Sequence, residues 1–264
     1  MRPPLKALLV LGLLLAAPSA LGRLKHRVPA FEPTDLDLED PHVLELDLQV
    51  GAVLRDQAPK TRIYVPDFEL DYGLTERVEL DVDGAVSLDE TDTGFVPTLD
   101  TLWTCVKLDF ATFRDERDER RVWALGAQLG PRWPTAPHSY GSGFGAVLLG
   151  ARMTPPIHMI VNGGVVTEPL DRTEPRRSAG VLGGFDLDYD LDRRERFSLL
   201  GEVAGAYSLG PDPNDVHATV GVEYSVAGWF DLTLVGFYGF LAGGDRAGVF
   251  LGLAPKWALR DPSG

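Results

Sequence analysis

The amino-acid sequence predicts an all-β fold, an antiparallel transmembrane β-barrel of about 12 strands. Three observations lead to this prediction. Between residues 43 and 257, apolar and polar side chains alternate in segments that end at Gly, Pro, Asp or Asn. These segments run for about 10 to 15 residues, whereas strands of soluble sheets usually have about five or six. A secretory leader precedes them, and no later segment reaches the about 20 apolar residues that a spanning helix needs.

Residues 1–22 have the three parts of a signal peptide. Arg2 and Lys6 are positively charged, residues 7–17 are almost entirely apolar, and small residues precede a cleavage site near Gly22. We therefore expect export with cleavage near Gly22, and a location in the outer membrane of a Gram-negative bacterium. An uncleaved anchor is the alternative. Residues 23–42 are polar and acidic, and we expect them to form a flexible lead-in on the periplasmic side.

The alternation is clearest in residues 44–50, 64–72 and 78–86, where a strand places the apolar residues on one side and Asp or Glu on the other. A helix would scatter the apolar residues. Further strands are expected at about 101–113, 123–129, 144–153, 157–167, 177–190, 196–208, 215–227, 229–241 and 246–259. The barrel is thus predicted over residues 43–259, with residues 260–264 as a tail. The charge run RDERDERR at residues 114–121 is interpreted as a solvated loop or a tight charged turn.

Aromatic residues lie near the ends of these segments, where they would form the girdles at the two membrane surfaces. The residues concerned are Tyr64, Tyr72, Trp103, Trp123, Tyr189, Phe197, Tyr207, Tyr224, Trp229, Tyr238 and Trp257. Trp103 fits least well because it shares a strand face with Lys107 and Asp109. A soluble β-sandwich also alternates, with its polar side toward water, and stays open as the alternative.

The composition excludes some partners. The formal charge is -14 at pH 7, so the surface would repel nucleic acid, and no basic stripe offsets it. The single cysteine, Cys105, cannot form an internal disulfide, and we interpret it as a small side chain in a strand. No cofactor is expected.

If the apolar side faces lipid, the charged side lines the lumen. The predicted lumen-lining residues are Glu45, Asp47, Asp67, Glu69, Asp71, Glu79, Asp81, Asp83, Lys107, Asp109, Asp186, Asp188, Glu202 and Glu223. Lys256, His158 and His217 are expected beside them. A lumen with this excess of carboxylates lowers the energy of cations. The alternative is that acids and bases pair across strands as structural bridges, and the sequence leaves both open.

Metal binding and catalysis have weaker support. Asp186, Asp188 and Asp190 have the spacing of a calcium loop, but Leu191 replaces its Gly and Phe197 its bidentate Glu, so no metal site is expected. A loop with His138, Ser139 and Ser142 would suit a hydrolase. Neighbouring residues of an extended chain point in opposite directions, however, so His138 and Ser139 would not form a dyad directly. We expect that the protein is not an enzyme and has no catalytic residues.

Residues 66–80, PDFELDYGLTERVEL, resemble the hairpin P-x-x-E-L-x-Y-G-L-T-D-R-x-E-L of an outer-membrane β-barrel family labelled as transporters of the meta-pathway of phenol degradation. Glu76 stands where that family has Asp. Lys107 matches the lysine of a later lysine–aromatic strand, although Leu108 replaces the aromatic residue and the preceding glycines are missing. By general pattern the resemblance covers about residues 43–258. It implies a barrel and a channel for small molecules.

The sequence therefore predicts an outer-membrane channel or transporter for small solutes, with cationic or aromatic solutes favoured. Its expected partners are outer-membrane lipids, the barrel-assembly machinery and a small-molecule solute, and no nucleic acid. Two alternatives belong to other classes. One is a soluble periplasmic β-barrel that binds a ligand, and the other is an outer-membrane lipid hydrolase.

Overall fold

The computed structural model describes residues 38–55, 61–115, 118–135, 139–154, 156–171, 179–192, 196–209, 214–241 and 245–259. The predicted leader, residues 23–37 of the predicted lead-in and the tail from residue 260 onward lie outside these ranges. Among the described residues, no helix is long and apolar enough to cross a membrane.

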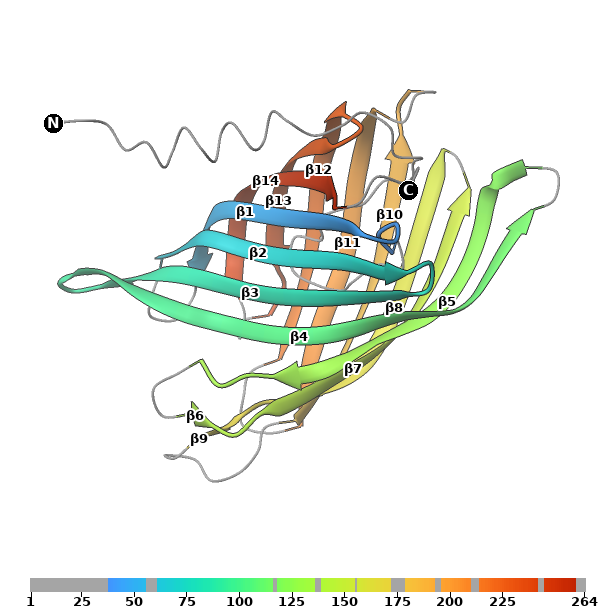
Figure 1. Ribbon diagram of the computed structural model, residues 1–264. Helices are drawn as coiled ribbons and strands as arrows, with labels where there is room; N and C mark the ends of the chain where they lie inside the picture. Colours follow the sequence, from blue (N-terminus) through green and yellow to red (C-terminus); the bar gives the residue numbers. More distant parts are fainter. Residues whose placement is uncertain are drawn as a thin grey trace, which may run out of the picture.

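Twelve antiparallel strands close into one barrel, which confirms the predicted fold (Figure 1). Around the barrel their order is β1-β14-β13-β12-β11-β10-β8-β7-β5-β4-β3-β2. The strands are β1 (Val43–Arg55), β2 (Thr61–Thr75), β3 (Val78–Thr91), β4 (Gly94–Asp115), β5 (Asp118–Arg132), β7 (Gly143–Thr154), β8 (Ile157–Thr167), β10 (Ala179–Asp190), β11 (Phe197–Ser208), β12 (Asp215–Ala227), β13 (Phe230–Gly239) and β14 (Asp245–Ala258). Two short strands, β6 (Ser139–Tyr140) and β9 (Leu170–Asp171), pair with each other in a separate sheet.

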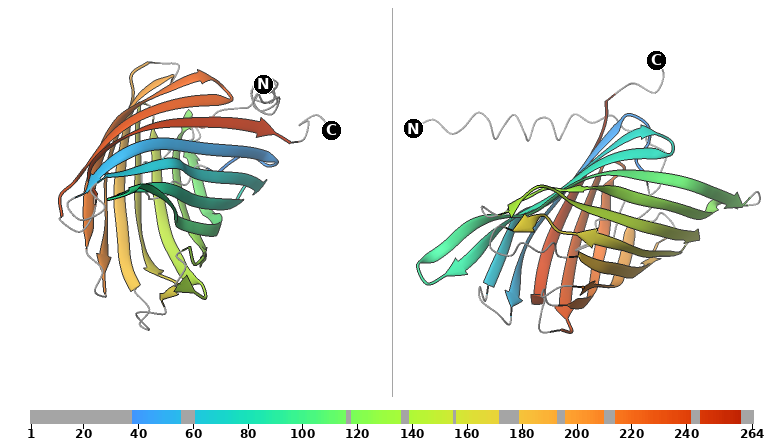
Figure 2. Two further views of the ribbon diagram at one scale, coloured as in Figure 1. Left: turned by 90° about the vertical axis from the view of Figure 1, so that its left-hand side faces the viewer. Right: turned by 90° about the horizontal axis from the view of Figure 1, so that it is seen from below.

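The barrel closes where β1 pairs with β14, with Val43 opposite Ala258. Figures 1 and 2 show that β1–β4 cross steeply over β11–β13 on the other side of the barrel. At the end where β1 begins and β14 ends, the connections have only two to six residues, and we call this the short-turn end. The connections at the opposite end have two to eleven residues, and we call it the long-loop end.

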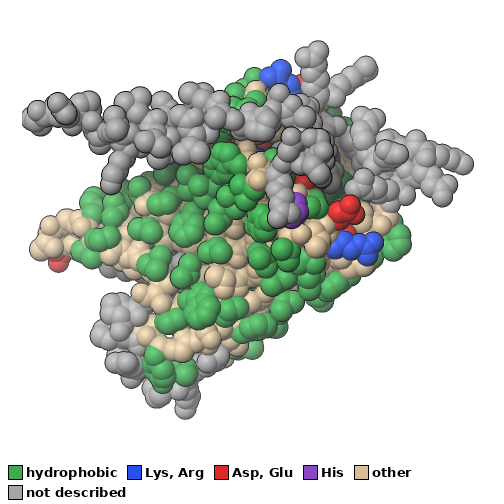
Figure 3. Space-filling model, in the orientation of Figure 1, with side chains coloured by type: hydrophobic (Ala, Val, Ile, Leu, Met, Phe, Trp, Pro, Cys, Tyr) green, Lys and Arg blue, Asp and Glu red, His purple; other side chains and the backbone are tan. Residues whose placement is uncertain are grey.

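Side chains alternate between the outside and the inside of the wall, except where the strand register shifts. In β7, Leu148 is 68% exposed, whereas the next residue, Leu149, is 3% exposed. Hydrophobic side chains cover the outer surface of β1–β4, and charged side chains appear only at its margins (Figure 3). The outside is therefore apolar and most charged strand residues point inward, which is the reverse of a soluble protein.

Two predicted girdle aromatics point into the barrel instead. Tyr64 is buried because β2 has an irregular register between Tyr64 and Asp67, which turns Tyr64 to the same side as the carboxylates. Trp103 is 2% exposed and its indole N–H donates to the carbonyl of Gly130 at 3.0 Å. The predicted girdle position of Tyr64 is therefore wrong, whereas Trp103 lies on the inward face that its place beside Lys107 and Asp109 in the strand indicated.

The charge run at residues 114–121 lies on a hairpin. Strand β4 reaches Asp115 and β5 begins at Asp118, so the strands extend further into the run than the sequence predicted. The backbones of β4 and β5 pair as far as Asp115 and Asp118 although the sequence there is highly charged. Only residues 116–117 separate the two strands.

Part of the interior is apolar. Ten inward side chains pack together on β4, β5, β7, β8 and β10, and we call this cluster the apolar wall: Trp103, Cys105, Val122, Ala124, Val147, Leu149, Ala151, Met153, Ile160 and Leu182. A second apolar cluster lies toward the long-loop end and contains Val53, Tyr64, Ala85, Val235, Phe237 and Phe250. The interior is thus divided into sectors of different chemistry.

Candidate functional site

The candidate site is a dense group of carboxylates inside the barrel near the short-turn end. It consists of inward side chains of β1, β2 and β3, and we call it the acidic wall: Glu45, Asp47, Glu69, Asp71, Glu79, Asp81 and Asp83. These residues lie together because alternate residues of a strand share a face and the three strands are neighbours. The alternation in the sequence therefore becomes a carboxylate surface.

Strand register places these carboxylates in rows. In one row Glu45 is opposite Asp71, which is opposite Asp81. In the next row Asp47 is opposite Glu69, which is opposite Asp83. Like charges directly opposite each other destabilise a sheet. The rows therefore carry an electrostatic cost that pairing with cations would relieve.

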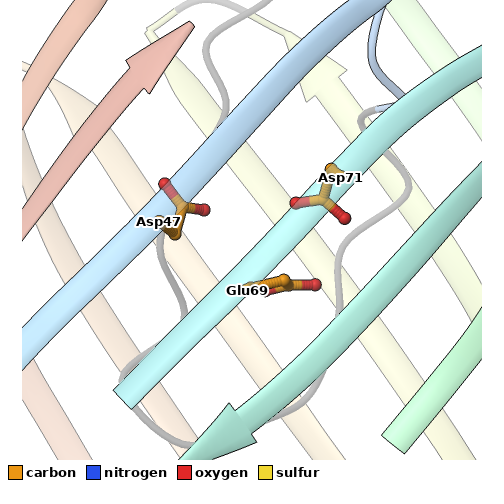
Figure 4. Close-up of side chains that lie close together, drawn as sticks. All are labelled: Asp47, Glu69 and Asp71. Carbon is orange, nitrogen blue, oxygen red and sulfur yellow. The ribbon is translucent and has the colours of Figure 1, made fainter. Parts of the chain in front are cut away.

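Two groups of three carboxylates share Asp71. Asp47, Glu69 and Asp71 have oxygen atoms within 4.8 Å of one another, and so do Asp71, Glu79 and Asp81. Figure 4 shows the first group side by side on β1 and β2. Two unit charges about 4 Å apart interact by about 4 kcal/mol at an effective dielectric constant of about 20. These oxygens are the ligand type that hard cations prefer, so these residues could hold a metal ion.

Two lysines compensate part of the negative charge. The Lys107 ammonium lies 2.8 Å from a Glu79 oxygen, and both side chains are buried. Lys256 lies 2.9 Å from Glu45 and 2.9 Å from Glu39. The alternative of structural ion pairs thus holds for Glu79 and Glu45.

An uncharged side chain on β5, a strand of the apolar wall, also hydrogen-bonds to the acidic wall. The Gln128 amide of β5 donates to Asp81 at 2.6 Å, across the intervening strand β4. Gln128 is buried, so this hydrogen bond links the two sectors. Sequence reasoning missed Gln128 because an isolated amide between apolar residues carries no signal of its partner.

The chain before β1 folds into the short-turn end. Glu39 is 7% exposed, and its backbone N–H donates to the carboxylate of Glu79. The backbone of Glu39 and Asp40 passes against Gly73, where an added methyl group would overlap their carbonyl oxygens. His42 has a φ of 69° and lies 3.1 Å from the hydroxyl of Tyr72. Glu39 therefore contacts the acidic wall directly, and Asp40 and His42 contact neighbouring residues of β2, which nothing in the sequence indicated.

Asp40 lies in this segment, outside the strands. Burial raises the pKa of its carboxyl group, and the neighbouring Glu39 raises it further, while Lys256 acts in the opposite direction. Docking of residues 39–42 thus places a carboxyl group where its charged form is disfavoured.

More inward carboxylates lie on β10 to β13. Asp188, Glu223 and Asp231 are buried there. Asp190 accepts a hydrogen bond from Ser198 at 2.8 Å and lies 3.3 Å from His158. Asp190 and Asp231 were not predicted, although Asp190 continues the alternation of Asp186 and Asp188.

Near the long-loop end, His217 sits between two carboxylates. Its ring nitrogens lie 2.8 Å from Asp215 and 3.7 Å from Glu202. The ring also meets Phe237 edge-on, with centroids 5.6 Å apart. Glu202 belongs to the predicted lumen-lining residues, but it lies with this cluster and not with the acidic wall.

The structure places all the predicted lumen-lining residues on the inward side of their strands. Most are buried, while Asp67, Glu69, Asp83, Asp109 and Asp186 are half-buried. That they line a path for solutes stays a prediction. Of the considered hydrolase residues, Ser139 lies in β6, Ser142 precedes β7, and His138 lies outside the described residues.

Comparison with known proteins gives a likeness of fold. No protein-family model matches the chain, and no curated protein matches its sequence. The crystal structure of an outer membrane channel from Pseudomonas putida F1 covers 86% of this chain and 99% of its own, with 12% identity and a TM-score of 0.58. The structure of the NanC porin covers 80% and 98%, with 8% identity and a TM-score of 0.57. The chain thus has the fold of outer-membrane β-barrels, and the label of phenol meta-pathway transport is not confirmed.

Proposed function

We propose that this protein is an outer-membrane channel that favours small cationic solutes. The observation that carries the proposal is the acidic wall inside a closed barrel whose outer surface is apolar. An apolar outer surface suits hydrocarbon, and a lumen with excess carboxylates attracts cations and repels anions.

The orientation follows from the connections. Outer-membrane barrels have short periplasmic turns and longer extracellular loops. The short-turn end would therefore face the periplasm, and the acidic wall would lie in the periplasmic half of the channel. A solute entering from outside would meet the His217 cluster before the carboxylates of β1–β3.

The interior also supports a solute with an apolar part. The apolar wall lies beside the acidic wall around the same barrel, and Gln128 joins them. A cation with an aromatic or aliphatic body could contact both sectors at once. The proposed solute class is therefore a small organic cation.

The test is the reversal potential of the refolded protein in a planar bilayer under a KCl gradient. The wild type should conduct with a preference for K⁺. The triple variant Asp67→Asn/Glu69→Gln/Asp71→Asn neutralises two carboxylates of the acidic wall and the adjacent inward Asp67, and it should lose much of that preference. A control variant, Glu90→Gln/Asp92→Asn, removes exposed carboxylates at the long-loop end and should change it little. An unchanged reversal potential in the triple variant would refute the role of the acidic wall.

A further inference from the structure

Arg152 is a charged side chain on the outward, mostly apolar side of β7. Outward residues of the same strand include Phe144, which is 46% exposed, and Leu148, which is 68% exposed. Arg152 continues this outward series and is itself exposed. It lies two residues before Thr154, where β7 ends at the short-turn end.

Strand register shows how unusual this position is. Trp123 of β5 is opposite Arg152, and Met159 of β8 is opposite it on the other side. Phe113 is in turn opposite Trp123, and Leu187 is opposite Met159. Arg152 is therefore one cation in a row that is otherwise aromatic or aliphatic across five strands.

The Arg152 side chain lies over an aromatic ring. Its guanidinium carbon lies 5.0 Å from the centroid of the Trp123 ring, within the range of cation–π interactions. Among the side chains that the structure describes, which do not include those of residues 114–121, no ion pair joins Arg152 to a carboxylate. Stacking on a ring uses the face of the guanidinium and leaves its N–H donors directed outward for an external acceptor.

The level of Arg152 along the barrel selects that acceptor. A charged side chain on the lipid side of a barrel costs about 2–4 kcal/mol at the bilayer midplane and about 0–1 kcal/mol near the interface. Near the end of β7, beside Trp123, the guanidinium would reach the headgroup layer, where tryptophan is also enriched. Phosphate oxygens are the acceptors of that layer, and they match the fork of donors in arginine. The pairing recurs at the same end, where Arg196 lies 5.9 Å from the Tyr224 ring centroid.

We propose that Arg152, stacked on Trp123, binds the phosphate of a phospholipid headgroup in the periplasmic leaflet. The assignment rests on the outer-membrane location proposed above, and it adds a lipid site on the outer surface that is independent of the channel interior. Phe113, which is 62% exposed, and Leu125, which is 56% exposed, flank the pair and would contact the acyl chains.

The test uses the refolded full barrel in vesicles of phosphatidylcholine with phosphatidylglycerol, followed by native mass spectrometry of the lipids that stay bound. Arg152→Gln should bind phosphatidylglycerol about tenfold more weakly than the wild type, as expected for the loss of a charge-assisted hydrogen bond. Arg152→Lys keeps the positive charge but loses the planar set of N–H donors. Its affinity for phosphatidylglycerol should therefore lie between those of the wild type and Arg152→Gln. Inorganic phosphate is added as a competitor and should displace the lipid only weakly, because it lacks acyl chains.

Arg132→Gln is the matched control. Arg132 also lies near a tryptophan, 6.0 Å from the Trp103 ring centroid, but that ring points into the barrel. This variant should retain phosphatidylglycerol like the wild type.

Equal retention of phosphatidylglycerol by Arg152→Gln and the wild type, in samples with folded gel mobility, would overturn the lipid site alone. If inorganic phosphate displaced phosphatidylglycerol from the wild type as effectively as an added phospholipid does, the assignment to a lipid headgroup would be overturned. Failure of the wild type to insert into vesicles would overturn both this site and the proposed location.

Discussion

The acidic wall and the apolar wall occupy the same barrel interior but are held together by different forces. In the acidic wall, the buried Glu79 pairs with Lys107 and accepts a hydrogen bond from the backbone of Glu39. In the apolar wall, Val147 and Leu149 are equally buried without any polar partner to satisfy. Burial of charge costs free energy unless every group is compensated, whereas burial of aliphatic groups is favourable by itself. The apolar wall should therefore supply stability, and the acidic wall should supply selectivity.

The sharpest way to break this comparison is to remove the cation of the buried ion pair. Lys107→Met leaves Glu79 buried beside other carboxylates, and we expect the free energy of unfolding to fall by about 3–5 kcal/mol. Denaturant titration of the barrel in vesicles would measure it. The double variant Lys107→Met/Glu79→Leu should recover most of the loss. A single variant as stable as the wild type would show that the pair is not buried as described.

The apolar wall can be tested with two adjacent leucines. Leu149→Ala opens a cavity inside the barrel and should lower the free energy of unfolding by about 2–5 kcal/mol. Leu148→Ala removes the same atoms from the outer surface, where lipid can fill the space, so its effect should be clearly smaller. The same titration applies to both variants. Equal losses would contradict the assignment of Leu149 to the interior and Leu148 to the outside.

The segment before β1 lies at the short-turn end, beside Glu79 of the acidic wall. Gly73→Ala places a methyl group against the backbone of Glu39 and Asp40, and such overpacking costs about 1–3 kcal/mol. We expect residues 39–40 to move away and the single-channel conductance to rise. Gly228→Ala is the control, because nothing lies within 4 Å of its added methyl group. Conductance that stays the same in both variants would mean that this segment does not narrow the path.

The smallest effect concerns pH. Because burial and Glu39 raise the pKa of Asp40 above its ordinary value of 3.8, the docked segment favours the protonated form. Docking should be strongest below pH 3.8 and weaken as pH rises through the raised pKa. Asp40→Asn should remove that dependence, measured as protection of residues 38–42 from protease across pH. A wild-type profile identical to that of Asp40→Asn would argue against any contribution of Asp40.

The two walls also differ in how well the sequence predicts them. Strands β1–β3 alternate between Leu or Val and Asp or Glu, so each side was identifiable from residue type, as Glu45 and Asp47 illustrate. In β5 and β7 both sides are apolar, and nothing in the residue types distinguishes Leu148 from Leu149. Only closure of the barrel decides which of the two points inward.

Other features depend on contacts between distant parts of the chain. Tyr64 changed sides because of a local irregularity in β2 that alternation alone does not reveal. The approach of Glu39 to Lys256 joins residues at opposite ends of the sequence, and it exists only because β1 pairs with β14. The number of strands and the inward position of the carboxylates could be predicted without knowledge of such contacts, because they follow from the alternation of apolar and polar residues along each strand.

The most direct test of the account is whether the outer surface touches hydrocarbon. Nitroxide labels attached after Leu148→Cys and Glu69→Cys, each in a Cys105→Ala background, would report collisions with oxygen and with a water-soluble nickel chelate in reconstituted vesicles. The account predicts high oxygen and low nickel accessibility at position 148, and nickel access at position 69. A label at position 148 that collides freely with the nickel chelate would mean that water covers the apolar side, which would contradict a membrane-spanning barrel.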